Sequence, residues 1–212
     1  FIITLGALDL SVGSTSAVVG VVMAMLLRDG VSIPLALLIV FALSAFLGWL
    51  NGFIAVKGKI EPFLVTLATM NIYRGIAMTL SRGRPIPIVA KSVTNAFGNG
   101  SVCGVPVPVI IVVVMFILTY YLFKKSKFGY YVRCIGGNTE AARVAGMPVG
   151  KIRILVFTMS GLYACVAGLI LASLMNAGMS DLGSTLALDA VAAVILGGTA
   201  ISGGYGTVWG TL

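Results

Sequence analysis

Apolar residues in this chain come in long runs that short polar stretches separate. Each run approaches the roughly 20 residues that carry an α-helix across the hydrocarbon core of a bilayer. Lipid offers the backbone no hydrogen-bond partners, so a helix is the structure that satisfies a run of this length. The pattern predicts membrane segments at about residues 12–27, 33–56, 62–80, 106–123 and 152–174, with a further, broken segment from residue 186 onward. We therefore expect an all-α, polytopic transmembrane helix bundle with at least six membrane segments.

Composition places the chain in a membrane as a whole. Of its 212 residues, 59% are hydrophobic and only 9% are charged, whereas soluble domains carry about 25% charged residues. The sequence starts at Phe1 rather than at Met, and both Phe1 and Leu212 fall within apolar runs. We therefore expect residues 1–212 to form a single transmembrane domain that is an excerpt of a longer chain, truncated at both ends.

Two glycine-rich stretches interrupt the helical pattern, GALDLSVGS at residues 6–14 and LGGTAISGGYG at residues 196–206. They share the spacing of Gly and Ser positions, as the halves of an internal repeat would. Broken helices at membrane depth are tolerated where they line a cavity, and transporters place substrate sites there. Residues 186–196 are too short to span alone, so a re-entrant hairpin and a full span both stay open. The glycines expected to break helices are Gly6, Gly13, Gly197, Gly198, Gly203 and Gly204.

Polar side chains within the apolar runs mark the candidate translocation path or its gate, because ionisable groups are costly in lipid and mostly functional. Arg74 needs a carboxylate, backbone carbonyls or water, and Asp9 and Asp189 are its candidate carboxylates. The alternative is that Arg74 extends toward the outer interface. The candidate path or gate residues are Asp9, Ser11, Asn71, Arg74 and Asp189.

Positive charges are divided unequally between the two sides of the expected bundle. One set of polar segments holds nine Lys and Arg residues and the alternate set holds four. Cytoplasmic segments of membrane proteins carry the excess of positive charge. We therefore expect the loop at 133–150, which belongs to the more basic set, in the cytoplasm, and the loop at 81–105 on the periplasmic side.

A basic island between two apolar runs contains the short helical motif EAARVAG at residues 140–146. Asn138 or Thr139 can cap the start of this helix. Glu140 lies where the positive end of the helix dipole favours a carboxylate, and Gly146 ends the helix. A helix of about two turns is marginal alone, so its own protein or a partner must hold it. Its small side chains suit close docking of a partner, and the alternative is a plain connector between membrane helices.

Several function classes are excluded by what the sequence lacks. It has no His, and its three Cys residues are isolated, so we expect no enzyme activity and neither a metal nor a cofactor. No Gly-rich loop ends in Lys-Ser or Lys-Thr, so this chain is not expected to hydrolyse ATP. The net charge of +8 gathers beside apolar runs, as topology signals do, which argues against nucleic acid. A secondary transporter of a small polar solute is the alternative, although few titratable groups are available for ion coupling.

EAARVAG resembles the first half of the cytoplasmic EAA motif of ATP-binding-cassette (ABC) importer permeases, in which Glu-Ala-Ala is followed by three residues and Gly. Longer segments resemble, in the same order, the ribose-type sugar permeases of the branched-chain amino acid/ribose permease superfamily. These segments are GALDLSVGS, FLVTLATMNIYRGIAMTLSRGRPI, FGYYVRCIGGNTEAARVAGMPVGKIRI and LDAVAAVILGGTAISGGYGTVWGTL. The chain departs from the family at Ala7, where Gly is frequent, at Tyr205, where a basic residue is common, and after Gly146, where the distal half of the EAA pattern is missing.

The resemblance implies a permease of about ten helices with a short cytoplasmic coupling helix, in a bacterial inner (plasma) membrane. It implies a dimer with a second permease subunit, identical or different, two cytosolic ABC ATPase subunits, and a periplasmic sugar-binding protein. It also implies that Glu140 is a polar contact to the ATPase, while ribose, other pentoses, galactose-like hexoses, polyols and furanosyl signals all fit as substrates. The implied coupling residues are Asn138, Glu140, Ala141, Ala142, Arg143 and Gly146.

Overall fold

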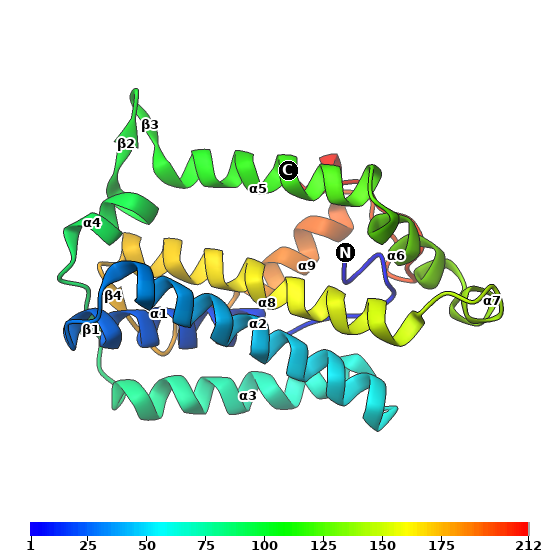
Figure 1. Ribbon diagram of the computed structural model, residues 1–212, viewed down its shortest axis with the longest axis horizontal. Coiled ribbons are helices and arrows are strands. Elements are labelled where there is room, and N and C mark those ends of the chain that lie inside the picture. Colours follow the sequence, from blue (N-terminus) through cyan, green and yellow to red (C-terminus); the bar gives the residue numbers. More distant parts are fainter. Residues whose placement is uncertain (212) are drawn as a thin grey trace.

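The computed structural model describes residues 1–211, apart from the side chain of Thr211, and shows an elongated helical bundle (Figure 1). Its long helices are α1 (Val12–Arg28), α2 (Ile33–Gly58), α3 (Pro62–Ser81), α5 (Val107–Lys124) and α8 (Val149–Leu174). Its short helices are α4 (Lys91–Thr94), α6 (Lys127–Gly137), α7 (Thr139–Val144) and α9 (Leu186–Leu196), with a π-helical turn at Asn95–Asn99 and a 3-10 turn at Trp209–Thr211. The strands are β1 (Ile86–Pro87), β2 (Ser101–Val102), β3 (Val105–Pro106) and β4 (Ala177–Gly178).

The long helices begin and end close to their predicted positions because local signals delimit them. Pro62 is the first residue of α3, where its missing N–H costs nothing. Lys59 after α2 and Arg82 after α3 have left-handed backbones, with φ angles of 53° and 51°. Within residues 1–211, the helices long and apolar enough to cross a membrane are α2, α3, α5 and α8. The predicted helical class is confirmed, whereas α1, with 17 residues, and α9, with 11, are shorter than these four.

α8 lies at the centre of the bundle, and α1 and α2 pack against it through small residues (Figure 1). Gly161 of α8 is so close to α2 that a Cβ there would overlap the carbonyl oxygen of Ser44. Gly168 faces α1, where a Cβ would lie 2.6 Å from the carbonyl oxygen of Ser16. Lipid tails are as apolar as the side chains, so membrane helices gain contact mainly through such close backbone approach. These positions fix α1, α2 and α8 relative to one another.

The two ends of the bundle carry different structures (Figure 1). At one end, β1 pairs antiparallel with β4, and β2 and β3 form a hairpin. At the other end, α6 and α7 connect α5 to α8. The stretches at 81–105 and 133–150 therefore lie at opposite ends. α6 was not predicted from the sequence, and it means that the chain reaches α7 through an amphipathic helix that buries Val132 and Ile135.

Candidate functional site

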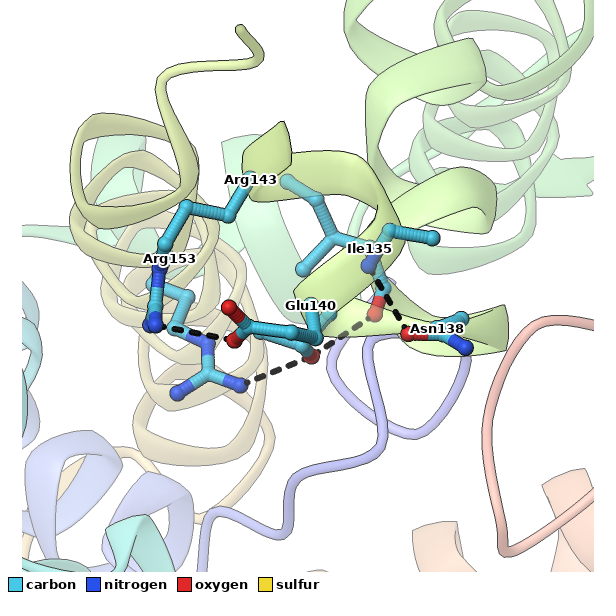
Figure 2. A network of polar contacts seen from close by, with 7 residues as sticks. Ile135, Asn138, Glu140, Arg143 and Arg153 are labelled. Atoms are coloured by element: carbon cyan, nitrogen blue, oxygen red, sulfur yellow. Dashed lines mark hydrogen bonds and ion pairs between the residues drawn. The ribbon is translucent and has the colours of Figure 1, made fainter. Parts of the chain in front are cut away.

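α7 forms at the predicted place, and Asn138 rather than Thr139 caps it (Figure 2). Oδ1 of Asn138 accepts a hydrogen bond from the backbone N–H of Ala141 at 2.9 Å. The hydroxyl of Thr139 instead donates to the carbonyl oxygen of Ile135 in α6, also at 2.9 Å. Beyond the helix, Gly146 has a φ of 78°, a left-handed conformation that glycine adopts without strain. The short helix is thus delimited by its own sequence at both ends.

Glu140 and Arg143 pair with each other on the exposed side of α7 (Figure 2). Nη1 of Arg143 lies 2.9 Å from Oε2 of Glu140, and both side chains are exposed. An exposed pair of this kind contributes about 0–1 kcal/mol to stability. Ala142 points the other way and is only 4% exposed. The expectation that all small side chains of the motif are open to a partner is therefore wrong for Ala142, because that side chain faces the neighbouring helices.

α7 rests on α6 and α8. Nη2 of Arg153, near the start of α8, donates to the hydroxyl of Thr139 at 3.3 Å (Figure 2). Beneath the helix, Ala142 belongs to a buried apolar cluster with residues of both neighbouring helices, among them Val132, Ile135, Val149 and Ile152. This apolar cluster holds α7 against α6 and α8.

A buried chain of hydrogen bonds runs from Tyr73 on α3 to Asp9 in the segment before α1. The hydroxyl of Tyr73 donates to Oδ1 of Asn51 on α2 at 3.0 Å. Nδ2 of Asn51 donates to the hydroxyl of Ser11 at 2.8 Å, and that hydroxyl donates to Oδ1 of Asp9 at 2.7 Å. From α8, the hydroxyl of Ser160 donates to the other carboxylate oxygen, Oδ2, at 2.7 Å. This network joins the first glycine-rich break to three helices with each member satisfied, which makes the arrangement specific.

Three members of this network, Asn51, Tyr73 and Ser160, were not among the predicted site residues. Asn51 and Tyr73 could have been identified from the sequence, since each is a polar group within an otherwise apolar run. Ser160 gave none, because it precedes Gly161 in a run of small residues that helix packing alone would explain. The structure thus brings the predicted Asp9 and Ser11 together and adds three partners.

A cavity of about 490 Å³ opens beside this network, between the N-terminal segment, α5, α8 and α9. Asp9 and Ser160 reach its wall. The wall also carries Thr119 and Tyr163, whose hydroxyl oxygens lie 2.6 Å apart. Most of the remaining wall is apolar. A few fixed hydroxyls and one carboxylate in an apolar cavity can orient a small polyhydroxylated solute.

Arg74 on α3 binds backbone carbonyls. Its Nη1 donates to the carbonyl oxygens of Ser180, at 2.5 Å, and Leu182, at 3.1 Å, both in the segment between β4 and α9. Within the described part of the chain, neither Asp9 nor Asp189 forms an ion pair with Arg74. The predicted carboxylate partners are therefore wrong, because Asp9 belongs to the buried network and Asp189 is exposed on α9. Of the partners that the sequence allowed, carbonyls are the ones present.

Asn71 and Gly13 also have surroundings other than those predicted. Asn71 is exposed on α3, and its Nδ2 donates to the carbonyl oxygen of Leu67 on the same helix at 3.0 Å. Gly13 lies in the first turn of α1, so it does not break a helix. It instead allows close approach of the segment before α9, since a Cβ on Gly13 would overlap the carbonyl oxygen of Gly183.

The other predicted glycines lie at interruptions of the helical backbone. Gly197 caps the end of α9. The remaining four have positive φ angles of 77° to 85°, namely Gly6, Gly198, Gly203 and Gly204. An L-residue with a side chain would be strained in this conformation. Both glycine-rich stretches are therefore irregular in structure, one before α1 and one after α9.

The chain is similar over its whole length to known transport proteins. Residues 1–212 match the family described as branched-chain amino acid transport system / permease component. The ribose import permease proteins of Haemophilus influenzae and Bacillus subtilis are each 38% identical to it over 100% of this chain and 67% and 66% of their own lengths. The L-arabinose ABC transporter permease protein of Azospirillum brasilense is 36% identical over 100% of this chain and 62% of that protein. The chain spans about two thirds of these relatives. No solved structure matches it significantly.

Proposed function

Because this chain belongs to the branched-chain amino acid transport system / permease component family, we propose that it is the membrane-spanning permease subunit of an ABC importer for a sugar or sugar-like solute. The observation that carries the proposal is the similarity over the whole chain to proteins named as ribose and L-arabinose permeases. A permease component is a transport subunit and not an enzyme, so ATP is hydrolysed by separate ATPase subunits. The same names do not favour a secondary transporter.

The exposed side of α7 is the proposed docking surface for a cytosolic ATPase subunit, which would place this end of the bundle in the cytoplasm. Val144 at the end of α7 is 82% exposed, and Ala141 and Ala145 beside it are also exposed. Glu140 already has Arg143 as its partner. We therefore expect the exposed small and apolar side chains to contribute most of the contact, because an exposed ion pair such as Glu140–Arg143 adds little energy.

Movement of α7 is the proposed source of alternating access. α7 packs on α6 and α8, and α6 follows α5 after two residues. ATP-driven closure of the ATPase subunits would shift α7 and move these helices as rigid levers. The proposed solute path passes the cavity beside Asp9, Ser11 and Ser160. At the opposite end, Arg74 is the proposed gate residue, since it holds the segment before α9.

α9 supports the re-entrant alternative for the second break. Its 11 residues extend about 16 Å at 1.5 Å per residue, roughly half of the 30 Å hydrocarbon core. The chain then turns back at the glycines from Gly197 to Gly204. For the whole protein we propose about ten helices in a bacterial inner membrane, a dimer with an identical or different permease subunit, and a periplasmic sugar-binding protein that delivers the solute.

The proposal is tested with the full-length permease, its ATPase subunits and its binding protein in liposomes. We expect ATP-dependent uptake of radiolabelled ribose or L-arabinose. Ala141→Trp fills the proposed docking surface and should lower uptake at least about tenfold, the effect of losing roughly 1.4 kcal/mol of docking energy. Ala141→Ser keeps the site small and is the matched control.

Two results would contradict this function. Absence of ATP-driven uptake of ribose, L-arabinose and a panel of other pentoses, hexoses and polyols by the wild-type importer would contradict the proposed substrate class. Normal uptake by Ala141→Trp, in amounts equal to those of Ala141→Ser, would contradict docking through α7.

A further inference from the structure

The two glycine-rich breaks meet each other and the end of α6. In Figure 1, the N-terminal trace and the loops after α9 both lie beside α6. The three segments are far apart in sequence, yet their backbones are in direct contact. We call this contact the glycine junction, and its members are Thr4, Gly6, Gly136, Gly203 and Gly204.

The five residues of the glycine junction contact one another through backbone atoms. The N–H of Gly204 donates to the carbonyl oxygen of Thr4 at 2.8 Å, which links the two breaks. A Cβ on Gly136 would overlap that same carbonyl oxygen and would lie 2.7 Å from the backbone nitrogen of Gly204. A Cβ on Gly203 would lie 2.8 Å from the nitrogen of Gly6 and 2.9 Å from the carbonyl oxygen of Gly136. Each of the three segments thus touches the other two with no room for a methyl group.

The junction lies next to α7 along the chain. Gly137 is the last residue of α6, and Asn138, the residue that follows, is the N-cap of α7. On the membrane side, Gly6 leads within a few residues to Asp9 and the buried network. Gly203 follows α9 and its cap. The junction is therefore placed between the proposed docking helix and both interruptions of the membrane helices.

We propose that the glycine junction transmits the displacement of α7 to both breaks at once, with Gly136 and Gly203 as positioning residues. This inference rests on the proposed function, because it assumes that an ATPase moves α7. Close-packed backbones are hardly compressible and therefore transmit a displacement, whereas interposed side chains can absorb part of it by changing rotamer. Both breaks then respond together, and the network at Asp9 rearranges whenever α7 moves.

Substitutions with matched controls test the junction. Gly136→Ala places a methyl group in the contact. In the control Gly137→Ala, one residue on, the new Cβ would lie 3.9 Å from the Cα of Gly204, an ordinary van der Waals distance. Gly203 has a φ of 85°, and the methyl group of Gly203→Ala would also crowd the junction. Gly30 has a similar φ of 80°, but the methyl group of Gly30→Ala would meet open space. The second control separates the strain of a positive φ from the loss of the junction. All four variants are compared in the reconstituted importer.

The measured quantity is sugar transported per ATP hydrolysed. We expect Gly136→Ala and Gly203→Ala to keep ATP hydrolysis but to lose about tenfold in this ratio, within the range of coupling between distant sites. Gly137→Ala and Gly30→Ala should keep the wild-type ratio. Ratios equal to those of the controls, or a parallel loss of hydrolysis and uptake, would show a merely structural role and overturn the proposal.

Hydrogen exchange in the wild-type importer provides a measurement that does not depend on the folding of a variant. Trapping the ATPase subunits with ATP and vanadate should change amide exchange in the peptides around both Gly6 and Gly204, since the N–H of Gly204 takes part in the junction. Unchanged exchange in either peptide would overturn the proposal. A wild-type importer that transports no sugar would instead refute the proposed function, so the two failures are distinguishable.

Discussion

Replacing Arg74 by Leu tests whether its guanidinium holds the segment between β4 and α9. A hydrogen bond from a charged group contributes about 1.5–3 kcal/mol. Arg74 donates to Ser180 and Leu182, but both bonds come from Nη1 and the site is only partly buried. We therefore expect Arg74→Leu to lower the free energy of unfolding by about 3 kcal/mol, the lower end of the range for two such bonds. For a chain of this size the melting temperature should fall by about 6–12 °C.

The assay is thermal unfolding of the purified protein in detergent, followed by tryptophan fluorescence. Asn71→Leu is the matched control, because Asn71 lies on the same helix and its side chain donates a hydrogen bond to the carbonyl of Leu67 within α3. Arg74→Lys should be intermediate, since an ammonium group lacks the planar fork of donors of a guanidinium. If Arg74→Leu melts within about 2 °C of Asn71→Leu, less than 1 kcal/mol apart, the guanidinium does not hold the segment and the reasoning is refuted.

Three further predictions concern stability. Gly161→Ala should destabilise the bundle by about 1–3 kcal/mol, because its methyl group overlaps a carbonyl of α2. The control Gly75→Ala places its methyl group in open space and should be neutral or stabilising. Equal melting temperatures of the two variants would contradict the close packing of α2 and α8. Asn138→Ala should cost about 1 kcal/mol through loss of the N-cap, seen as faster amide exchange in α7, and unchanged exchange would argue against the cap. Tyr73→Phe removes the hydrogen-bond donor to the buried Oδ1 of Asn51 and should lower the free energy of unfolding by about 1–3 kcal/mol, measured by thermal unfolding. A wild-type melting temperature would mean that water replaces the hydroxyl.

The helices were predictable because their signals are local. α3 was expected at 62–80 and is observed at Pro62–Ser81, since a long apolar run and a proline at its start both lie within the segment itself. α6 was not expected because its 11 residues contain Lys, Tyr and Arg and lie in a basic island. It is stable as a helix through the apolar cluster that it shares with α7 and α8, which the local sequence does not reveal.

Among the site residues, too, features set by nearby residues were predictable, whereas features set by helix packing were not. A cap at Asn138 or Thr139 and the end of α7 just before Gly146 were predictable, because both depend on neighbours within a few positions. The partner of Arg74 was not, because carbonyls are present at every residue and only packing selects those of Ser180 and Leu182. The burial of Ala142 was likewise decided by which face of α7 meets α6 and α8.

The sequence by itself determined a helical membrane protein, the positions of its long helices, the two glycine-rich irregular stretches and the short capped helix α7, because these follow from hydrophobicity and from backbone preferences within a few residues. Only the tertiary structure decided which distant groups meet. It joined Asp9 to Asn51 and Ser160, and it brought both breaks against α6. Such contacts depend on how helices far apart in sequence pack together, and no local pattern specifies that geometry.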